Sequence, residues 1–163
     1  MFEYDFKNLE IADIVNSIII YAVSKKASDI HFDPCDSGLK VRLRIDGVLQ
    51  NHAIVPPLYQ KNLITRIKLI SNMNITESRL PQDGAIKSII NGIDLDMRVS
   101  SLTTNLGEKI VIRILDYSKS AEGLESLGFS SQNLEKIKHM INVPNGIILV
   151  TGATGTGKST TVY

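Results

Sequence analysis

Near its end the chain carries the octapeptide GATGTGKS, residues 152–159, directly after the apolar run 146–151. The run predicts a short buried strand, and G-x-x-x-x-G-K-S after a strand is typical of a P-loop. Its glycines let the backbone turn tightly and bring N–H groups up to phosphate oxygens without a Cβ in the way. A glycine-rich linker after a strand is the less favoured alternative. The spacing therefore predicts a phosphate-binding loop.

Each part of this loop has an expected role. Lys158 supplies a mobile positive charge for the β and γ phosphates, and the Ser159 hydroxyl can ligate Mg²⁺. A helix should start at about Gly157, so that its N-terminal dipole points at the anion. The loop is therefore expected to bind a nucleotide polyphosphate together with Mg²⁺. The predicted nucleotide-binding residues are Gly152, Ala153, Thr154, Gly155, Thr156, Gly157, Lys158, Ser159 and Thr160, with Ser159 as the metal ligand.

Length and composition limit the classes of protein that remain. The 163 residues give room for one domain, or one domain plus part of another. A formal net charge of +1 gives no basic excess, so no direct nucleic-acid binding is expected. The single cysteine, Cys35, excludes an internal disulfide within these residues. The apolar run 18–23 is too short to span a bilayer, and the acidic N-terminus does not resemble a signal peptide. We expect a cytoplasmic protein.

Apolar residues recurring every three to four positions predict two helices in the first part of the chain. The first covers 9–26, with Lys25 and Lys26 in its last turn, where cations complement the helix dipole. The second covers 58–73, and its expected buried residues are Leu63, Ile67 and Ile70. Between and after these helices, alternating residues predict strands.

Turn signals separate the predicted strands. Asp46-Gly47 and Asn91-Gly92 each predict a two-residue hairpin. The segment 79–84, Arg-Leu-Pro-Gln-Asp-Gly, is expected to be a turn from its proline and Asp-Gly content.

The first strand places Ile30 and Phe32 on one face, and Asp29, His31 and Asp33 on the other. The Asp-x-His-x-Asp pattern could supply metal ligands. The next strand, however, alternates apolar residues with basic ones, which are Lys40, Arg42 and Arg44. An acidic strand face beside a basic one favours cross-strand charge pairing over a metal site.

Two later strands each place an arginine on the polar face. In 93–100 this is Arg98, and in 109–115 it is Arg113. Periodicity alone favours exposed arginines on a sheet, possibly paired with Asp94 or Asp96.

The remaining segments predict a second domain. Residues 117–126 lose periodicity and are expected to form a linker, after which Ser130 or Ser131 caps a helix. The buried stripe of that helix is expected to consist of Leu134, Ile137 and Ile141. Pro144-Asn145-Gly146 predicts a turn into the strand before the P-loop.

Several stretches, in unbroken order, resemble the secretion ATPase superfamily, which drives type II secretion, type IV pilus assembly and DNA uptake. They are 27–34 (ASDIHFDP), 41–49 (VRLRIDGVL), 79–84 (RLPQDG), 98–100 (RVS), 107–109 (GEK), 111–115 (VIRIL) and 152–161 (GATGTGKSTT). The resemblance implies an α/β protein with a PAS-like domain over 1–116, an antiparallel sheet with helices, and a linker over 117–126. Residues 127–163 would be the truncated beginning of a RecA-like P-loop domain.

The resemblance also implies functions that the pattern alone does not give. Members form hexameric homo-oligomeric rings that act on an inner-membrane platform protein, so the protein would meet the membrane only through partners. Arg98 and Arg113 would reach the γ-phosphate of ATP, which makes them catalytic residues together with Lys158 and reverses the interpretation from periodicity. The signatures resemble the assembly and secretion branch more than retraction motors.

The chain departs from the family pattern in two kinds of feature. Ala153 stands where the family usually has proline, and Ser159 where it usually has threonine; a P-loop tolerates both. Other features of the family would lie after Tyr163: the acidic Mg²⁺-binding strand, the carboxylate box with the catalytic base, the histidine box and any four-cysteine zinc motif. From the resemblance we also expect these residues to lack the further N-terminal domain that many members carry. We therefore expect either a longer natural protein or an excised piece, and negligible ATP hydrolysis by these residues alone.

Two other functions stay open at this point. The chain could be a non-catalytic interaction module that docks onto neighbouring subunits or a membrane-bound partner. An unrelated P-loop kinase or transporter ATPase is the weaker alternative, because it leaves 27–115 unexplained.

Overall fold

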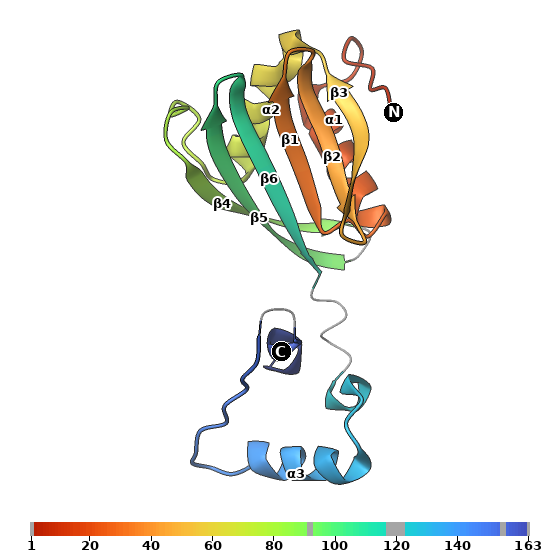
Figure 1. The fold of residues 1–163 in the computed structure, drawn as a ribbon, viewed down its shortest axis with the longest axis vertical. Coiled ribbons are helices and arrows are strands. Elements are labelled where there is room, and N and C mark those ends of the chain that lie inside the picture. Colours follow the sequence, from red (N-terminus) through yellow and green to blue (C-terminus); the bar gives the residue numbers. More distant parts are fainter. Residues whose placement is uncertain (1, 91–92, 117–122, 154–155, 163) are drawn as a thin grey trace. The chain divides into compact units, whose positions relative to one another are not determined.

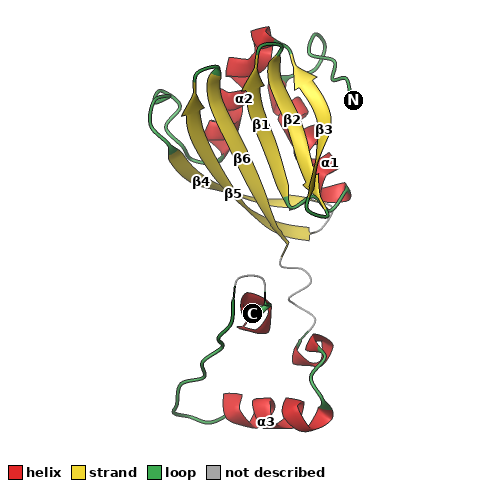
Figure 2. Cartoon of the chain, in the orientation of Figure 1, coloured by secondary structure: helices red, strands yellow, loops and turns green. Residues whose placement is uncertain are grey.

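The computed structural model describes residues 2–90, 93–116, 123–153 and 156–162. The chain divides into two compact units, Met1–Asp116 and Tyr117–Tyr163, which are treated separately below. Within its described residues, the first unit is a six-stranded antiparallel sheet with two helices on one face (Figures 1 and 2). No helix that the structure describes is both long enough and apolar enough to cross a bilayer.

The elements of the first unit are α1 (Ile11–Ser24), β1 (Asp29–Cys35), β2 (Gly38–Ile45), β3 (Val48–Val55), α2 (Pro57–Ile70), β4 (Gln82–Ile90), β5 (Ile93–Thr104) and β6 (Gly107–Asp116). The strand order is β3-β2-β1-β6-β5-β4, and every neighbouring pair is antiparallel. Two three-stranded meanders, β1 to β3 and β4 to β6, are thus joined through the pairing of β1 with β6. This long-range pairing decides which side chains meet on the sheet.

The core lies between the sheet and the two helices, and the predicted alternation is confirmed on its strands. The buried apolar side chains of the sheet include Ile30, Phe32, Val41, Leu43, Leu95, Met97, Val99, Ile110 and Ile112. From α1, Ile14 and Ile18 are fully buried, and each such side chain contributes about 1.5–3 kcal/mol relative to an exposed one. The polar residues that alternate with this set therefore lie on the sheet face turned away from the helices, which we call the open face.

Both predicted helices are present, but each is shorter than expected. α1 ends at Ser24, so Lys25 is its C-cap and Lys26, with φ +54°, lies beyond it rather than in the last turn. α2 buries Leu63 and Ile67 as predicted, while Ile70 is half-buried. It ends at Ile70 rather than at residue 73, because Asn72 adopts the left-handed conformation, φ +57°, that commonly terminates helices.

The predicted hairpin at Asp46-Gly47 is confirmed. The two residues join β2 to β3 with φ +49° and φ +81°, the positive angles that a type I′ turn requires. The second predicted hairpin, Asn91-Gly92, falls outside the described residues, although β4 and β5 on either side of it are antiparallel partners.

The predicted turn over 79–84 is wrong in its second half, because β4 already begins at Gln82. Gly84 is therefore a strand residue, paired with Val99 of β5. A Cβ on Gly84 would lie 2.3 Å from the carbonyl oxygen of Ser71, so glycine is needed here for close approach of two backbones.

In its described residues, the second unit contains a 3₁₀ helix (Leu124–Leu127), α3 (Ser131–Ile141) and α4 (Lys158–Val162). Ser130 caps α3 as predicted, because its Oγ accepts a hydrogen bond from the Asn133 backbone N–H at 3.4 Å. The expected linker, 117–126, overlaps the 3₁₀ helix, so its last residues are structured.

Two expectations for this unit are wrong for one physical reason. Residues 146–151 form no strand, because no other segment described in this unit offers the backbone partners that a strand needs. Likewise the expected buried stripe of α3 is not buried: Leu134 and Ile137 are half-buried and Ile141 is 55% exposed. An apolar pattern predicts which face will be buried, but a second surface must be present to bury it.

Candidate functional site

The glycine-rich loop of the second unit closes on itself between Ala153 and Lys158. The carbonyl oxygen of Ala153 accepts a hydrogen bond from Thr156 Oγ1 at 2.9 Å and another from Lys158 Nζ at 2.6 Å. The lysine ammonium therefore lies against the loop backbone, in a hydrogen bond that is exposed to solvent. Thr154 and Gly155, at the middle of the loop, fall outside the described residues.

Two of the loop glycines lie where the backbone turns tightly or where a Cβ would be crowded, as the sequence predicted. A Cβ on Gly152 would lie 2.5 Å from Thr156 Oγ1, so any larger residue would displace the hydroxyl that donates to the Ala153 carbonyl. Gly157 has φ +88°, a conformation that glycine adopts without strain. The next residue, Lys158, begins α4, within one residue of the predicted start.

The donors of this loop fit a polyphosphate. Among the residues that the structure describes, no carboxylate forms an ion pair with Lys158, whose hydrogen bond goes to a neutral carbonyl. Within the described residues its positive charge is therefore not neutralised and can attract an anion. Ser159 and Thr160, the other residues predicted here, lie in α4.

The open face of the first unit carries a row of charged residues from four neighbouring strands. In register, Arg44 of β2 lies opposite Asp29 of β1, Asp29 lies opposite Arg113 of β6, and Arg113 lies opposite Arg98 of β5. Asp29 binds on both sides: Oδ1 lies 3.0 Å from Arg113 Nε, and Oδ2 lies 3.4 Å from Arg44 Nε. We call these four residues the arginine row.

Asp29 is the most buried member of the arginine row, with 8% of its side chain exposed. Burial by itself raises the pKa of its carboxyl, but hydrogen bonds from Arg113 and from Ser28 Oγ, at 2.8 Å, outweigh burial and lower the pKa below its ordinary value. The carboxylate is therefore charged at neutral pH.

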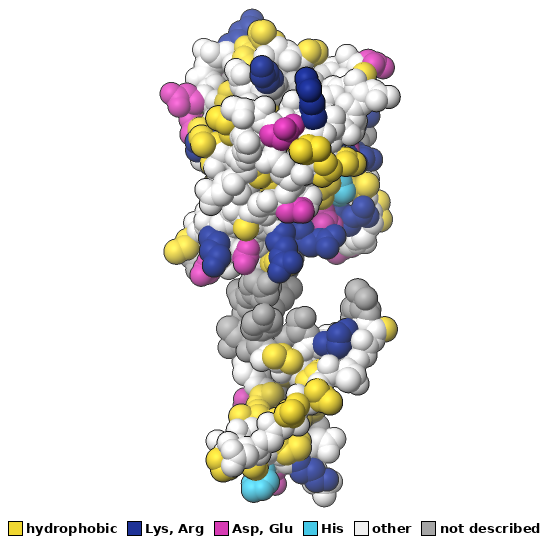
Figure 3. Space-filling model, turned by 90° about the vertical axis from the view of Figure 1, so that its left-hand side faces the viewer, with side chains coloured by type: hydrophobic (Ala, Val, Ile, Leu, Met, Phe, Trp, Pro, Cys, Tyr) yellow, Lys and Arg dark blue, Asp and Glu magenta, His cyan; other side chains and the backbone are white. Residues whose placement is uncertain are grey.

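A second carboxylate, four residues along β1 from Asp29, forms a similar arrangement. Asp33 Oδ2 accepts a hydrogen bond from Arg42 Nε at 2.8 Å, and Oδ1 lies 2.9 Å from Lys109 Nζ of β6. Burial would raise the pKa of Asp33, and these two cations lower it. Figure 3 shows basic and acidic side chains side by side on this unit, next to a histidine. The predicted charge pairing between β1 and β2 is thus confirmed.

His31 lies between the two carboxylates on β1. Both of its ring nitrogens are buried and have no hydrogen-bond partner in the described part of the chain. Burial lowers the pKa of His31, and the nearby Asp33 and Asp29 only partly oppose that effect. The ring is therefore neutral at pH 7.

Both predicted arginines lie on the open face and are exposed. The partner suggested for them was wrong in one case: Arg113 pairs with Asp29, 84 residues away, and not with Asp94 or Asp96. That partner follows from the pairing of β1 with β6, which local periodicity does not reveal.

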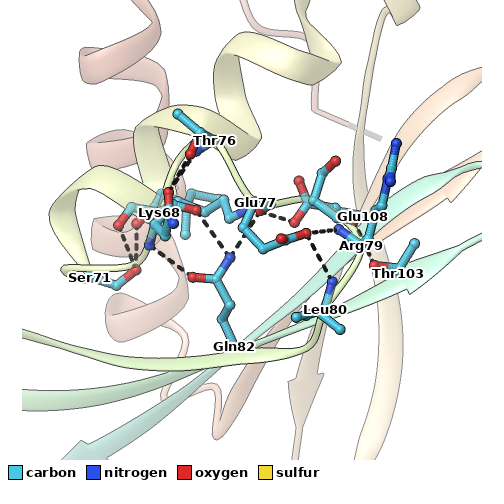
Figure 4. Close-up of polar contacts among 12 residues, drawn as sticks. Lys68, Ser71, Thr76, Glu77, Arg79, Leu80, Gln82, Thr103 and Glu108 are labelled. Atoms are coloured by element: carbon cyan, nitrogen blue, oxygen red, sulfur yellow. Dashed lines mark hydrogen bonds and ion pairs between the residues drawn. The ribbon is translucent and has the colours of Figure 1, made fainter.

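Sequence reasoning missed a network of hydrogen bonds around a buried lysine, on the side of the sheet that the helices cover (Figure 4). Lys68 of α2 is 1% exposed, and its Nζ donates to Glu108 Oε1 at 2.6 Å and to the Glu77 carbonyl at 2.5 Å. Gln82 Nε2 donates to the same Glu77 carbonyl at 3.0 Å, so the segment before β4 is tied to α2. The available signal was the position of Lys68 next to Ile67, within the apolar stripe of α2.

Comparison with known protein sequences supports the resemblance. The family described as "Type II/IV secretion system protein" matches residues 6–163. Type II secretion system protein E of Xanthomonas campestris pv. campestris is 45% identical over 150 residues, which are 92% of this chain and 26% of that protein. The type IV pilus assembly ATPase PilB of Myxococcus xanthus is 44% identical over 155 residues, 94% of this chain and 27% of that protein. The chain thus spans about a quarter of the length of these relatives.

Solved structures show the same fold at low sequence identity. The ATPase DotB of Legionella pneumophila matches with a TM-score of 0.66 and 20% identity, over 97% of this chain and 42% of that chain. The pilus retraction motor PilT with bound ADP matches with a TM-score of 0.60 and 24% identity, over 95% and 41%. From its motifs and from a family match over nearly its whole length, the chain belongs to the type II/IV secretion ATPase family.

Proposed function

We propose that the chain is the nucleotide-sensing part of an ATPase motor for type IV pilus assembly or type II protein secretion, with DNA uptake as a related role. The observation that carries this proposal is the loop in which Lys158 Nζ lies 2.6 Å from the Ala153 carbonyl, with no carboxylate partner in the described residues. Among the relatives, one with 44% identity is named a pilus assembly ATPase. Identity to the retraction motor is lower, at 24%.

In this proposal the loop binds the phosphates of ATP. Lys158 and the backbone N–H groups of 152–157 hold the phosphate oxygens, and Ser159 holds Mg²⁺. When bound, Mg²⁺ neutralises part of the phosphate charge. On binding, the ammonium of Lys158 exchanges a neutral carbonyl for a charged oxygen, which is a stronger partner.

Arg98 and Arg113 are proposed to bind the terminal phosphate. They are exposed, lie on neighbouring strands and carry like charges, and Asp29 alone in the arginine row opposes them. An anion with several oxygens relieves that repulsion, and guanidinium groups suit it because they bind phosphate through two parallel hydrogen bonds. Such contacts distinguish ATP from ADP.

At the level of the whole protein, the first unit is proposed to be the PAS-like domain and the second the start of the RecA-like domain. The protein would form a hexameric ring in the cytoplasm, at the inner face of the membrane, through a platform protein. We further propose that residues 1–163 alone hydrolyse ATP negligibly. Steady turnover by this chain that is lost in Lys158→Ala would contradict that part.

The test is a calorimetric titration of the chain with Mg·ATP, repeated with Lys158→Ala. Lys136→Ala is the matched control, because Lys136 is an exposed lysine of α3 in the same unit. Micromolar binding that is lost only in Lys158→Ala supports the proposal. Absence of binding, together with concentration-dependent assembly without nucleotide, supports the interaction module instead.

A further inference from the structure

Arg113 has a long side chain that is 67% exposed, yet it is held at one point. A free arginine side chain loses rotamer entropy when it becomes ordered on binding. The hydrogen bond from Arg113 Nε to Asp29 Oδ1, 3.0 Å, orders this side chain before any ligand arrives. Because only 8% of the Asp29 side chain is exposed, its carboxylate is a fixed partner for Arg113 on the open face.

The atom that Asp29 contacts leaves the other end of the guanidinium available. Arginine has five N–H donors, of which one is on Nε and four are on the two terminal nitrogens. The contact between Arg113 and Asp29 uses Nε. Among the described residues, no hydrogen bond is recorded from either terminal nitrogen of Arg113, so these two nitrogens, which form the fork suited to a phosphate, are available to bind one.

Asp29 is itself fixed through its second oxygen. Oδ2 accepts a hydrogen bond from Ser28 Oγ at 2.8 Å and lies 3.4 Å from Arg44 Nε. Oδ1 is thus left for Arg113. The arginine row holds three cations and one anion, so Asp29 offsets part of the repulsion between Arg98 and Arg113 without cancelling the attraction for an anion.

We infer that Asp29 is the positioning residue for Arg113, holding the guanidinium by Nε so that its terminal nitrogens bind the terminal phosphate of the nucleotide. This inference rests on the proposed function. It assigns Asp29 no contact with the nucleotide, and its effect should therefore appear only in the preference for ATP over ADP.

The chain offers a matched control on the same strand. Asp33 also accepts an Nε hydrogen bond from an arginine, Arg42, and also bridges to a cation of β6, Lys109. Neither partner has a proposed role in nucleotide binding. Asp33→Asn therefore removes a comparable ion pair from the sheet without releasing Arg113.

The experiment measures the affinities of the intact protein for Mg·ATP and Mg·ADP in five forms: unchanged, Arg113→Ala, Asp29→Asn, both together, and Asp33→Asn. We expect Arg113→Ala to lower the ATP/ADP affinity ratio by about tenfold or more, the effect of losing a charged hydrogen bond. Asp29→Asn should lower it by about fivefold through misplacement of the guanidinium. The double variant should match Arg113→Ala alone, and Asp33→Asn should leave the ratio within about twofold.

The outcomes separate this inference from the proposed function. If Arg113→Ala leaves the ratio unchanged, or the unchanged protein binds neither nucleotide, the proposed function fails and this inference fails with it. If Arg113→Ala lowers the ratio but Asp29→Asn does not, or Asp33→Asn lowers it equally, only the positioning role of Asp29 is overturned. Should Asp29→Asn fail to fold, Asp29→Glu replaces it: it keeps the charge but moves the carboxylate by one methylene. A ratio lowered by Asp29→Glu supports positioning, and an unchanged ratio overturns it.

Discussion

Arg98 of β5 lies directly opposite Arg113 of β6 in the antiparallel register, on the open face of the sheet. Side chains in such positions have Cβ atoms about 4.5–5.5 Å apart, and like charges there destabilise a sheet. Asp29 binds Arg113 from the other side, but the structure records no ion pair for Arg98 within the described residues. The sheet therefore keeps an unfavourable pair at the place where an anionic ligand is proposed to bind.

Replacing Arg98 with an acid should stabilise the first unit. In Arg98→Glu a repulsive pair with Arg113 becomes an attractive one, and an opposite-charge cross-strand pair contributes about 0.2–1 kcal/mol. We expect the thermal midpoint of the chain to rise by about 2–4 °C, measured by circular dichroism at low salt. Nucleotide discrimination should fall in the same variant.

The control for this prediction reverses a favourable pair on the neighbouring strand. Lys87 of β4 lies opposite Asp96 of β5, so Lys87→Glu places two acids together and should lower the midpoint. An Arg98→Glu protein that unfolds at a lower temperature than the unchanged chain would show that Arg98 is not under repulsion.

The parts of the fold that depend on nearby residues were predictable. The core face of β1, the hairpin at Asp46-Gly47 and the cap at Ser130 each follow from residues within a few positions of one another. The backbone turn at Gly157 and the helix that begins at Lys158 also belong here, because both follow from one continuous motif. A local sequence pattern is sufficient to predict structure that depends only on interactions between nearby residues.

The parts of the fold that depend on residues far apart in the sequence were not predictable. The partner of Arg113 is 84 residues away, and its identity requires knowing that β6 lies beside β1. The burial of Lys68 requires knowing that Glu108, 40 residues away, neutralises it. The run 146–151 has strand composition, but the described residues of the second unit contain no strand to pair with it, so composition alone gave the wrong element.

Truncating Lys68 should destabilise the first unit strongly. Lys68→Ala leaves Glu108 without its buried partner and leaves the Glu77 carbonyl short of a donor. Removing one member of a buried ion pair costs about 3–5 kcal/mol. Urea unfolding at pH 7 measures this loss.

Lys68→Met with Glu108→Gln provides the comparison, because the pair of changes keeps the volume and removes both charges. It should cost clearly less than Lys68→Ala. Equal losses in the two proteins would mean that packing, and not the ion pair, explains the role of Lys68.

A methyl group at residue 84 should also be poorly tolerated. In Gly84→Ala the new Cβ would lie 2.3 Å from the Ser71 carbonyl oxygen, so β4 and the end of α2 must separate. We expect a loss of about 1–3 kcal/mol in unfolding free energy. Ser88→Ala on the same strand is the control and should stay within about 0.5 kcal/mol. A tolerated Gly84→Ala would show that the segment after α2 moves freely.

Acid should destabilise the sheet in two steps, each assigned to groups of the open face. The pKa of His31 is lowered from 6.5 by burial, so below pH 6.5 the unfolded chain takes up a proton that the folded chain does not. Stability therefore falls as the pH drops below 6.5, until the folded ring is also protonated. The pKa values of Asp29 and Asp33 are lowered from 3.8, so their contribution is present above pH 3.8 and is lost as the pH falls through their folded values.

The urea midpoint measured against pH checks both steps. His31→Gln should flatten the first step, although His52, whose pKa is also lowered by burial, keeps part of it. Asp33→Asn should reduce the second step, because the group that titrates is gone. His139→Gln is the control, since His139 is exposed on α3, and it should leave the curve unchanged. A first step that survives removal of both His31 and His52 would show that other groups cause it.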